Sequence, residues 1–279
     1  MENIPQISIC IPTYNQTIHL KKLLVSIFNQ KEVSYEIIVT DDSTTNDVEE
    51  LIQTHNSNIN NHQINYFRNN PSLGAPKNWN FGISLAKGEF IKIMHHDQWF
   101  EDDYALKKQL DQIVKEKNTF VFTAVKNVFR GRVYDFRISK KELEDIKSEP
   151  EKLILANLIG GPTAILYPKS ANIQFDEKII WLVDIDFYLQ LFKKGFKIKF
   201  IDEVQYTSMT DFDSLTNNNL IDSEKQLIEY SYLYKKHVSS LPFLKRIKYF
   251  FEIYKIIILP LKPKNYILQF FRLFKKILN

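Results

Sequence analysis

The sequence has little cysteine and glycine and no long apolar run. Cys10 is the single cysteine among 279 residues, so the chain cannot form an intrachain disulfide. With seven glycines, it contains neither the GxGxxG nor the GxxxxGK(S/T) loop that cradles phosphates at a helix N-terminus. No window reaches the roughly 18 consecutive apolar residues of a membrane-spanning helix. These absences argue against a disulfide-stapled scaffold, a glycine-rich phosphate loop and a spanning helix.

A secretion signal is also missing from the start of the sequence. The opening MENIPQISICIPTYN lacks a basic segment followed by a long apolar core. Together with the single cysteine, this predicts a protein that is made and kept in the cytoplasm. Hydrophobic residues make up 44% and charged residues 25% of the chain, which is typical of a folded globular protein.

Positive charge is concentrated near the C-terminus. The whole chain has a net charge of +4, whereas the segment 241–279 contains nine lysines or arginines and one glutamate. That segment therefore carries about +8, and the other 240 residues carry about −4. This asymmetry is a stronger functional clue than the overall charge.

Two kinds of apolar segment alternate along the first hundred residues. Short runs rich in β-branched residues predict strands, and longer amphipathic segments predict helices, the first with Thr17 as its N-cap. The predicted strands cover 7–11, 35–40, 64–69 and 89–94, and the predicted helices cover 17–30, 47–55 and 74–86. This alternation predicts βαβ units and an α/β fold with a mainly parallel sheet.

Polar side chains directly follow three of these strands. They are Thr13 to Asn15, the pair Asp41 and Asp42, and His95 to Asp97. In an open parallel sheet, ligands bind beyond the carboxyl ends of the strands. We therefore expect these three clusters to converge on one crevice.

Two of these clusters have both a structural and a functional interpretation. Asp41 and Asp42 can cap the following helix, or one of them can accept hydrogen bonds from a nucleotide base or ribose. His95, His96 and Asp97 can be surface residues, or they can hold a divalent cation that replaces the missing phosphate loop.

Asp184 and Asp186 lie on an otherwise apolar segment, WLVDIDFYLQL. Because residues i and i+2 of a helix point in different directions, we expect one acid to face the crevice. The other is then expected to face solvent or to cap the helix. An acid on an apolar scaffold can serve as a general base, because partial burial raises its pKa. The alternative interpretation is that these acids only stabilise the N-terminus of the helix.

In their order along the chain, these stretches resemble the motifs of the family 2 glycosyltransferases. The resemblance runs from about Ile7 to Thr216 and rests on ISICIPTYNQ, YEIIVTDDSTTND, LAKGEFIKIMHHDQWF, GGPTAILYPK and WLVDIDFYLQLFKKG. It implies a GT-A type, Rossmann-like αβα sandwich as a catalytic domain over 1–218, with about 1–100 for the sugar nucleotide and 101–218 for the acceptor. The segment 219–279 is then a C-terminal basic amphipathic helical extension.

The resemblance also implies roles for individual residues. Asp184 matches the catalytic base. Asp97 matches the last carboxylate of the D-x-D motif, which holds the metal, and His95 stands at the first position of that motif. The residues that it places beside the nucleotide sugar are Pro12, Thr13, Asn15, Asp41, Asp42, Lys77, His96, Trp181, Ser214 and Thr216.

This sequence departs from the family pattern near both sites. His95 replaces the first D-x-D acid, Gln98 stands where relatives have a further acid, and Val183 stands where an acid precedes the base. A neutral imidazole can still ligate a divalent ion, or it can orient a ribose or a phosphate. Without an acid at 183, any rise in the pKa of Asp184 has to come from burial.

The implied reaction is an inverting, in-line transfer of a sugar from a nucleotide-diphosphate donor to a hydroxyl of a glycan or lipid-linked acceptor. Asp184 takes the hydroxyl proton, and Mn²⁺ or Mg²⁺ stabilises the leaving diphosphate. A catalytically weak sugar-nucleotide binder or scaffold of the same fold is the alternative. A sugar-nucleotide pyrophosphorylase is a third hypothesis, but PTYNQTIHLKK lacks the glycine-rich loop that it requires.

The basic tail predicts amphipathic helices with aromatic stripes. The first stripe consists of Phe243, Ile247, Phe250, Tyr254 and Ile257. Such helices suit an anionic membrane surface, so we expect 241–279 to attach the protein to the inner face of the cell membrane, where polysaccharide or glycolipid is assembled. Packing on the catalytic domain, or on a second copy to form an oligomer, is the alternative. We expect no nucleic-acid partner, because no such signature is present.

Overall fold

The computed structural model describes residues 4–58, 63–210 and 223–257, and within them nine strands form one sheet. The strands are β1 Ile7–Thr13, β2 Tyr35–Asp41, β3 Ile64–Arg68, β4 Phe90–Ile93, β5 Gln98–Phe100, β6 Thr119–Phe129, β7 Arg132–Phe136, β8 Ile165–Pro168 and β9 Lys197–Thr210. The helices are α1 Ile18–Phe28, α2 Asp47–Asn56, α3 Ala75–Leu85, α4 Ala105–Ile113, α5 Lys140–Ser148, α6 Val183–Lys193, α7 Ser223–Leu233 and α8 Phe243–Ile257. A π-helical turn, Tyr234–Val238, follows α7.

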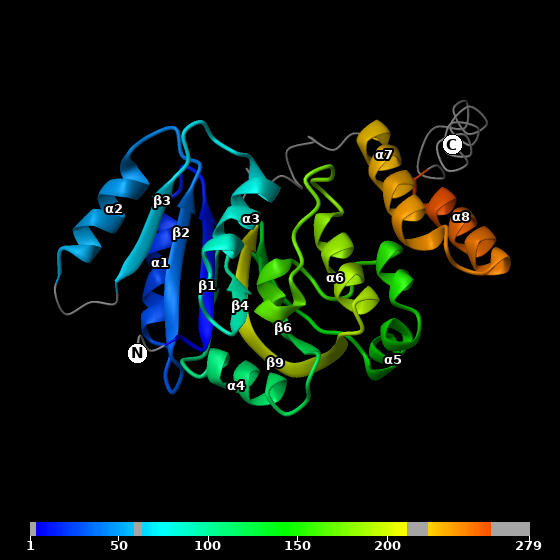
Figure 1. Cartoon of the computed structure of the whole chain (residues 1–279), viewed down its shortest axis with the longest axis horizontal. Helices are drawn as coiled ribbons and strands as arrows, with labels where there is room; N and C mark the ends of the chain where they lie inside the picture. Colours follow the sequence, from blue (N-terminus) through cyan, green and yellow to red (C-terminus); the bar gives the residue numbers. More distant parts are fainter. Residues whose placement is uncertain (1–3, 59–62, 211–222, 258–279) are drawn as a thin grey trace.

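The first half of the sheet is parallel, as the alternation of strands and helices predicts. β1 lies between β2 and β4, and β3 pairs with the outer side of β2, all in parallel register (Figure 1). The carboxyl ends of β1, β2 and β4 therefore meet at one edge of the sheet. β8 then joins β4 to β6 by antiparallel pairing, and β9 runs parallel to β6. The complete sheet is mixed, with its longest ladders parallel.

Two apolar cores cover the two faces of the sheet. One core packs α1, α2 and α4 against Ile7, Ile9 and Ile11 of β1. The other contains Cys10 of β1 together with residues of α3, α5, α6, α7 and α8. Adjacent residues of β1 enter different cores because side chains alternate across a strand. The predicted αβα sandwich is therefore confirmed.

Two predicted elements differ in detail from the structure, and the long strand β9 is irregular. β1 continues through Pro12 to Thr13, because β4 pairs only as far as Cys10 and the missing proline N–H therefore breaks no ladder bond. Thr17 lies at the N-cap of α1, but its side chain makes no capping hydrogen bond. β9 is one bent strand, whose register with β6 shifts on both sides of Ala124.

The helices α7 and α8 lie at the end of the molecule opposite α2 (Figure 1). Packing on the rest of the chain accounts for one face of α8, which buries Tyr249, Phe250, Ile253 and Ile257. The predicted stripe is divided in the structure, because Phe250 and Ile257 are buried whereas Phe243 and Ile247 are exposed, along with Leu244 and Phe251. The predicted domain boundary at 218 lies outside the described residues. None of the described helices is both long enough and apolar enough to cross a bilayer.

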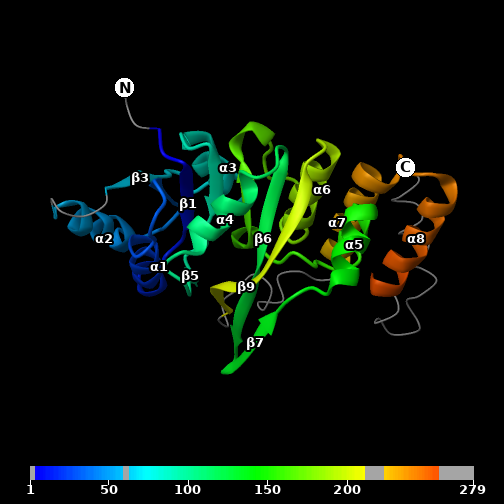
Figure 2. The same ribbon diagram turned by 90° about the horizontal axis from the view of Figure 1, so that it is seen from below.

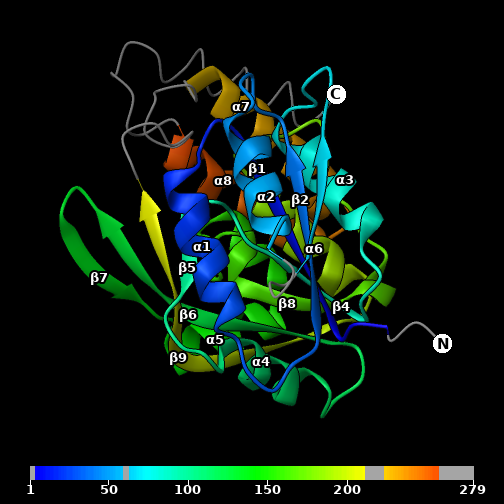
Figure 3. The same ribbon diagram turned by 90° about the vertical axis from the view of Figure 1, so that its left-hand side faces the viewer.

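The hairpin of β6 and β7 extends beyond the helical layers, and the end of β9 runs beside it (Figure 2, Figure 3). On its other side, the end of β9 pairs with β5, a strand that the sequence pattern did not predict. The backbone N–H of Met209 donates to the carbonyl of Asp97 at 3.1 Å. β9 therefore brings the second half of the chain to the edge where β4 ends.

Candidate functional site

The turns after β1 and β2 are bound to each other. Asn15 adopts a left-handed backbone with φ of 48°, and its N–H donates to the Ser43 hydroxyl at 2.8 Å. Its side-chain oxygen accepts from the N–H of Thr44 at 2.9 Å. The N–H of Asp42 donates to the carbonyl of Thr13 at 3.0 Å. Two of the predicted clusters are thus assembled into one surface at the sheet edge.

Asp41 is fully buried, and its carboxylate binds groups of the protein itself. One oxygen accepts from the N–H of Ser43 at 2.9 Å and from the Ser43 hydroxyl. The other accepts from the hydroxyl of Tyr66 at 2.7 Å. Asp41 therefore stabilises the turn after β2. Asp41 does not cap α2, whose N-cap is Asn46.

Asp42 also holds backbone, although it lies nearer the surface of the edge. One oxygen accepts from the side chain of Asn69 at 2.7 Å and from the N–H of Leu73 at 3.1 Å. The other accepts from the N–H of Gly74, directly before α3, at 2.8 Å. Asp42 therefore orders the loop between β3 and α3, and its predicted contact with a nucleotide base stays a prediction.

His95 and His96 follow β4 and are partly buried. Burial, and then the neighbouring His96, lowers the pKa of His95 to about 4. Burial and then His19 lower the pKa of His96 to about 4 against the opposing effect of a hydrogen bond to the Pro12 carbonyl. Both imidazoles are therefore neutral at pH 7, which is the form that ligates metals.

A segment just before β8 supports this histidine pair. The Thr163 hydroxyl accepts from the N–H of His95 at 3.3 Å, and the ring of Trp79 on α3 lies 4.8 Å from the His95 ring. Lys92 of β4 is fully buried and donates to the Thr163 carbonyl at 2.6 Å and to Gln109 at 3.0 Å. Burial lowers the pKa of Lys92 to about 7.

Asp184 lies in the first turn of α6 and is partly buried. Burial raises the pKa of its carboxyl from 3.8 to about 7. Burial, and then the charge of Asp184, raises the pKa of Tyr206 on β9 and of Tyr188 on α6. The Tyr188 hydroxyl donates to the carbonyl of Gly160 at 2.8 Å, which joins α6 to the segment that ends at Thr163.

Three predicted site residues carry buried polar atoms that have no hydrogen-bond partner among the described residues. These atoms are Thr13 Oγ1, His95 Nε2 and Asp184 Oδ1. Buried polar groups in folded proteins are nearly always paired, so each such atom needs an explanation.

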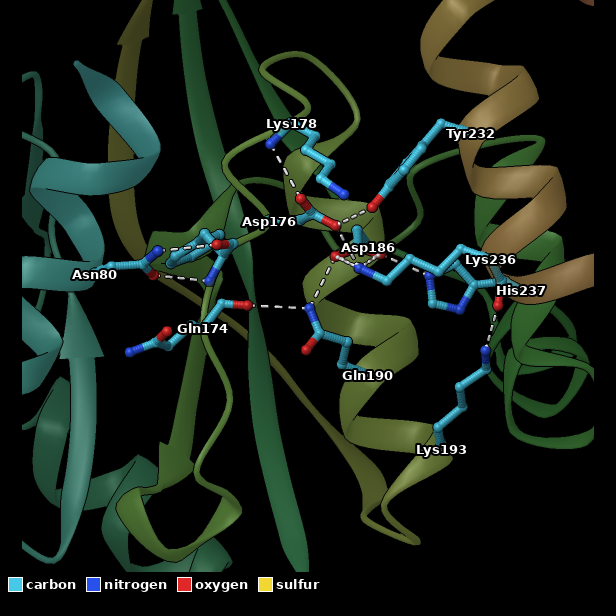
Figure 4. Close-up of polar contacts among 11 residues, drawn as sticks. Asn80, Gln174, Asp176, Lys178, Asp186, Gln190, Lys193, Tyr232, Lys236 and His237 are labelled. Carbon is cyan, nitrogen blue, oxygen red and sulfur yellow. Dashed lines mark hydrogen bonds and ion pairs between the residues drawn. The ribbon is translucent and has the colours of Figure 1, made fainter. Parts of the chain in front are cut away.

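Asp186 corrects one prediction, because it faces neither solvent nor its own helix N-terminus. It is fully buried, and its carboxylate lies 2.6 Å from Nε2 of His237 and 2.9 Å from Nζ of Lys236, both in the π-helical turn (Figure 4). Lys236 also donates to Asp176 at 2.7 Å. Asp186 is therefore an anchor for the C-terminal helices.

The remaining predicted residues are scattered. Lys77 is exposed on α3. The ring of Trp181 packs edge-on against Tyr230 of α7, with ring centroids 5.7 Å apart. Ser214 and Thr216 lie outside the described residues.

Four residues near these groups escaped the sequence interpretation. Thr163 and Trp79 contact His95, Tyr206 lies near Asp184, and Glu229 of α7 binds the backbone before α6. The GGPT stretch was a usable signal for Thr163. No local sequence pattern indicated a role for Glu229, because it binds backbone about fifty positions earlier in the chain.

One sheet between two helical layers, with polar groups gathered past β1, β2 and β4, is the architecture of a nucleotide-binding α/β protein. Comparison with known proteins narrows this class. The family described as Glycosyl transferase family 2 matches residues 8–176, so the chain belongs to this family.

Two curated relatives match shorter stretches. The Abequosyltransferase RfbV of Salmonella typhimurium is 38% identical over 99 residues, which cover 35% of this chain and 29% of the relative. The GalNAc(5)-diNAcBac-PP-undecaprenol beta-1,3-glucosyltransferase of Campylobacter jejuni is 33% identical over 116 residues, which cover 41% and 35%. This chain therefore spans about a third of the length of each of these relatives.

A solved structure resembles nearly the whole fold. The crystal structure of S. aureus TarS 1–349 in complex with UDP-GlcNAc matches with a TM-score of 0.71 and 17% identity. The match covers 96% of this chain and 79% of that one. The similarity confirms the predicted GT-A type fold.

Proposed function

We propose that this protein is an inverting glycosyltransferase that moves a sugar from a nucleotide-diphosphate donor to a hydroxyl of a glycan or lipid-linked acceptor. The observation that carries the proposal is the carboxylate of Asp184. It lies in the first turn of α6 with an unpaired oxygen and a pKa raised to about 7. Family membership and the names of the relatives support the reaction class.

The proposed chemistry is a single displacement at the anomeric carbon. Asp184 accepts the proton of the acceptor hydroxyl while the hydroxyl oxygen bonds to that carbon. The bond from the same carbon to the diphosphate oxygen breaks, and the nucleoside diphosphate leaves with the electron pair. One displacement from the face opposite the leaving group inverts the configuration and needs no second nucleophilic carboxylate.

A divalent cation fits the donor side of this proposal. Asp97 and His95 would hold it, because a carboxylate and a neutral imidazole are both suitable ligands and His95 Nε2 is a buried atom that lacks a partner in the described structure. When bound, Mn²⁺ or Mg²⁺ would stabilise the charge of the leaving diphosphate. The described residues contain no cluster of three or more metal-ligating side chains, so diphosphate oxygens would have to complete the coordination.

A thermal-shift screen of sugar nucleotides tests donor and metal together, because a ligand that binds the folded state raises the melting temperature. We expect a uridine, thymidine or guanosine diphosphate sugar to stabilise the protein only when Mn²⁺ or Mg²⁺ is present. Asp97→Ala should abolish this shift, and Asp103→Ala, at the exposed pair with Lys31, should retain it. Equal stabilisation in chelator would contradict the metal assignment.

Turnover with the stabilising donor then tests the chemistry. Asp184→Asn should still bind the donor but lose roughly 10²- to 10⁴-fold in kcat, which is the usual contribution of a general base. Donor binding with no turnover, unchanged by Asp184→Asn, would instead identify a sugar-nucleotide binder of the same fold. His95 in place of the first acid of the metal motif is the feature that favours this second function.

We also propose that α8 and the basic segment 241–279 hold the protein on the anionic inner face of the cell membrane. One face of α8 packs on the protein, and the exposed face carries Phe243, Leu244, Ile247 and Phe251. Lys245 and Lys248 border it, and both approach Glu149, at 3.6 and 3.5 Å. Aromatic and aliphatic side chains flanked by cations match an anionic lipid surface.

Vesicle sedimentation tests this attachment. The protein should pellet with vesicles that contain phosphatidylglycerol and stay in solution with pure phosphatidylcholine, and salt should release it. Phe251→Asp should abolish pelleting, whereas Val133→Asp, at an exposed apolar residue of the distant hairpin, should leave it unchanged. Loss of a dimer on gel filtration, with no effect on vesicles, would show that a second copy covers this face.

A further inference from the structure

The carboxylate of Glu229 on α7 binds three consecutive backbone N–H groups just before α6. One oxygen accepts from Ile180 at 3.0 Å and from Trp181 at 3.3 Å. The other accepts from Trp181 at 3.0 Å and from Leu182 at 2.8 Å. Glu229 is itself buried, so its carboxylate is committed to this segment.

The local sequence offers no substitute for this carboxylate. The N-cap residue of α6 is Leu182, and no side chain caps the helix there. The side chains of Ile180 and Trp181 also have no acceptor oxygen. Backbone N–H groups at a helix N-terminus need partners, and an anion is favoured at this positive end of the helix. α7 therefore supplies the acceptor that the chain lacks at this point.

The segment that Glu229 holds ends two residues before Asp184. On the far side of Asp184, the carboxylate of Asp186 is bound by Lys236 and His237 of the π-helical turn (Figure 4). The first turn of α6 is thus held before and after Asp184 by elements that follow in the C-terminal region. These elements lie beyond residues 8–176, which the family description matches.

We propose that Glu229 is a positioning residue for sugar transfer: it fixes the turn that enters α6, and thereby the direction of the Asp184 carboxylate toward the acceptor hydroxyl. The inference rests on the proposed role of Asp184 as the base. On this proposal α7 contributes to catalysis, because the rate of sugar transfer falls roughly 100-fold when the base is misplaced by about 1 Å.

The pKa of Asp184 distinguishes a positioning role of Glu229 from a purely structural one. If Glu229 only stabilised the fold, its substitution would not change this pKa. The groups that face α6 around it are Glu229 on α7, Tyr188 and Asp186 on α6, Lys236 and His237 in the π-helical turn, Tyr206 on β9, and Lys92, whose ammonium lies 5.9 Å from the Tyr206 ring. Removing the negative charge of Glu229 takes one anion away from the start of α6, where Asp184 and Asp186 are the acids of the first turn. That favours the ionised form of Asp184, so its pKa falls.

The test compares Glu229→Gln with a matched variant of the same helix. Tyr232→Phe removes the hydrogen bond of 2.6 Å from α7 to Asp176, but it leaves the backbone before α6 untouched. We expect Glu229→Gln to lower kcat roughly 10- to 100-fold with donor KM within about twofold, and to move the acidic limb of the kcat/KM profile to lower pH. Tyr232→Phe should leave kcat and the limb unchanged, although both variants lower the melting temperature.

Glu229→Asp is measured alongside, because it keeps the negative charge on a shorter stem. We expect the acidic limb of its kcat/KM profile to match that of the unmodified protein, while its kcat is reduced. If Glu229→Gln does not fold, Glu229→Asp is the variant that is compared with Tyr232→Phe. If Glu229→Gln and Glu229→Asp keep the kcat and pH profile of Tyr232→Phe while Asp184→Asn is inactive, the positioning role is overturned and the proposed function stands. If Asp184→Asn is itself fully active, the proposed base is wrong.

Discussion

Four aspartates near the predicted site occupy four different environments. Asp41 is buried and bound by Ser43 and Tyr66, and Asp42 orders a loop through two backbone N–H groups and Asn69. Asp186 is paired with Lys236 and hydrogen-bonded to His237, whereas Asp184 has a buried oxygen with no hydrogen-bond partner among the described residues. Burial of Asp184 raises the pKa of its carboxyl to about 7, which is in the range of a general base.

The first prediction at the residue scale concerns activity against pH. Burial raises the pKa of Asp184 to about 7, and a general base must be deprotonated to act. We therefore expect kcat/KM to fall about tenfold per pH unit below about pH 7. Initial rates with the preferred donor between pH 5 and 9 provide the measurement. A profile that stays flat down to pH 5 would contradict the assignment of Asp184.

The second prediction at the residue scale concerns stability. Because the carboxyl pKa is about 7 in the folded protein and 3.8 at its ordinary value, the folded state holds the proton more tightly. The stability from this group is complete below pH 3.8 and is lost as the pH rises through 7. Asp184→Asn should thus stabilise the protein by about 1–3 kcal/mol at pH 8 and by little at pH 4. Urea unfolding at both pH values measures the difference.

At the scale of elements, the junction before β4 depends on close contact between backbones. The N–H of Gly88 donates to the hydroxyl of Ser8 on β1 at 2.8 Å, and that hydroxyl donates to Glu36 of β2 at 2.6 Å. A Cβ at position 88 would lie 2.6 Å from the backbone nitrogen of Ser8. The junction of β1, β2 and β4 therefore requires glycine for space.

A pair of glycine substitutions tests this requirement. Gly88→Ala should destabilise the protein by about 2 kcal/mol or more, because backbone atoms have to move. Gly82→Ala in α3 is the matched control, since its Cβ would meet only ordinary contacts, 3.5 Å from Cys10 and Thr40. The control should be neutral or stabilising by up to about 1 kcal/mol. Similar melting temperatures for the two variants would refute the argument.

At the scale of the whole molecule, α7 and the π-helical turn are joined to α6 and to the segment before it by buried polar contacts. Asp186 is fully buried beneath Lys236 and His237, and Asp176 binds Lys236 and Tyr232 (Figure 4). A buried charge that loses its partner destabilises a protein far more than an exposed pair does. These contacts therefore couple the stability of α7 and of the π-helical turn to that of α6.

Asp186→Ala tests this coupling by removing the buried carboxylate, which leaves His237 without this partner and Lys236 with Asp176 alone. We expect a loss of about 1–3 kcal/mol in the free energy of unfolding, which is the cost of leaving a buried polar group without its hydrogen-bond partner. Asp111→Ala breaks the exposed pair with Lys107 on α4 and should cost at most about 0.5 kcal/mol. Denaturant unfolding of both variants supplies the comparison, and equal losses would show that the buried cluster contributes nothing special.

Local pattern was sufficient for the elements and for the edge of the sheet that carries the site. The β-branched runs and amphipathic segments marked β1 to β4 and α1 to α3, because the periods of strands and helices are set by neighbouring residues. The polar residues after β1, β2 and β4 could be assigned to one edge, since parallel strands share their carboxyl ends. Recognition of the family also needed only the order of these motifs.

Tertiary structure alone decided what each polar group does. Tyr66 of β3 binds Asp41, the loop before α3 binds Asp42, and the π-helical turn binds Asp186. No local pattern therefore separates a buried anchor from a general base. The same holds for Glu229, which acts on backbone that lies 47 to 49 residues earlier in the chain. The burial and hydrogen bonding of a side chain depend on which residues lie near it in space, and the tertiary fold determines those neighbours.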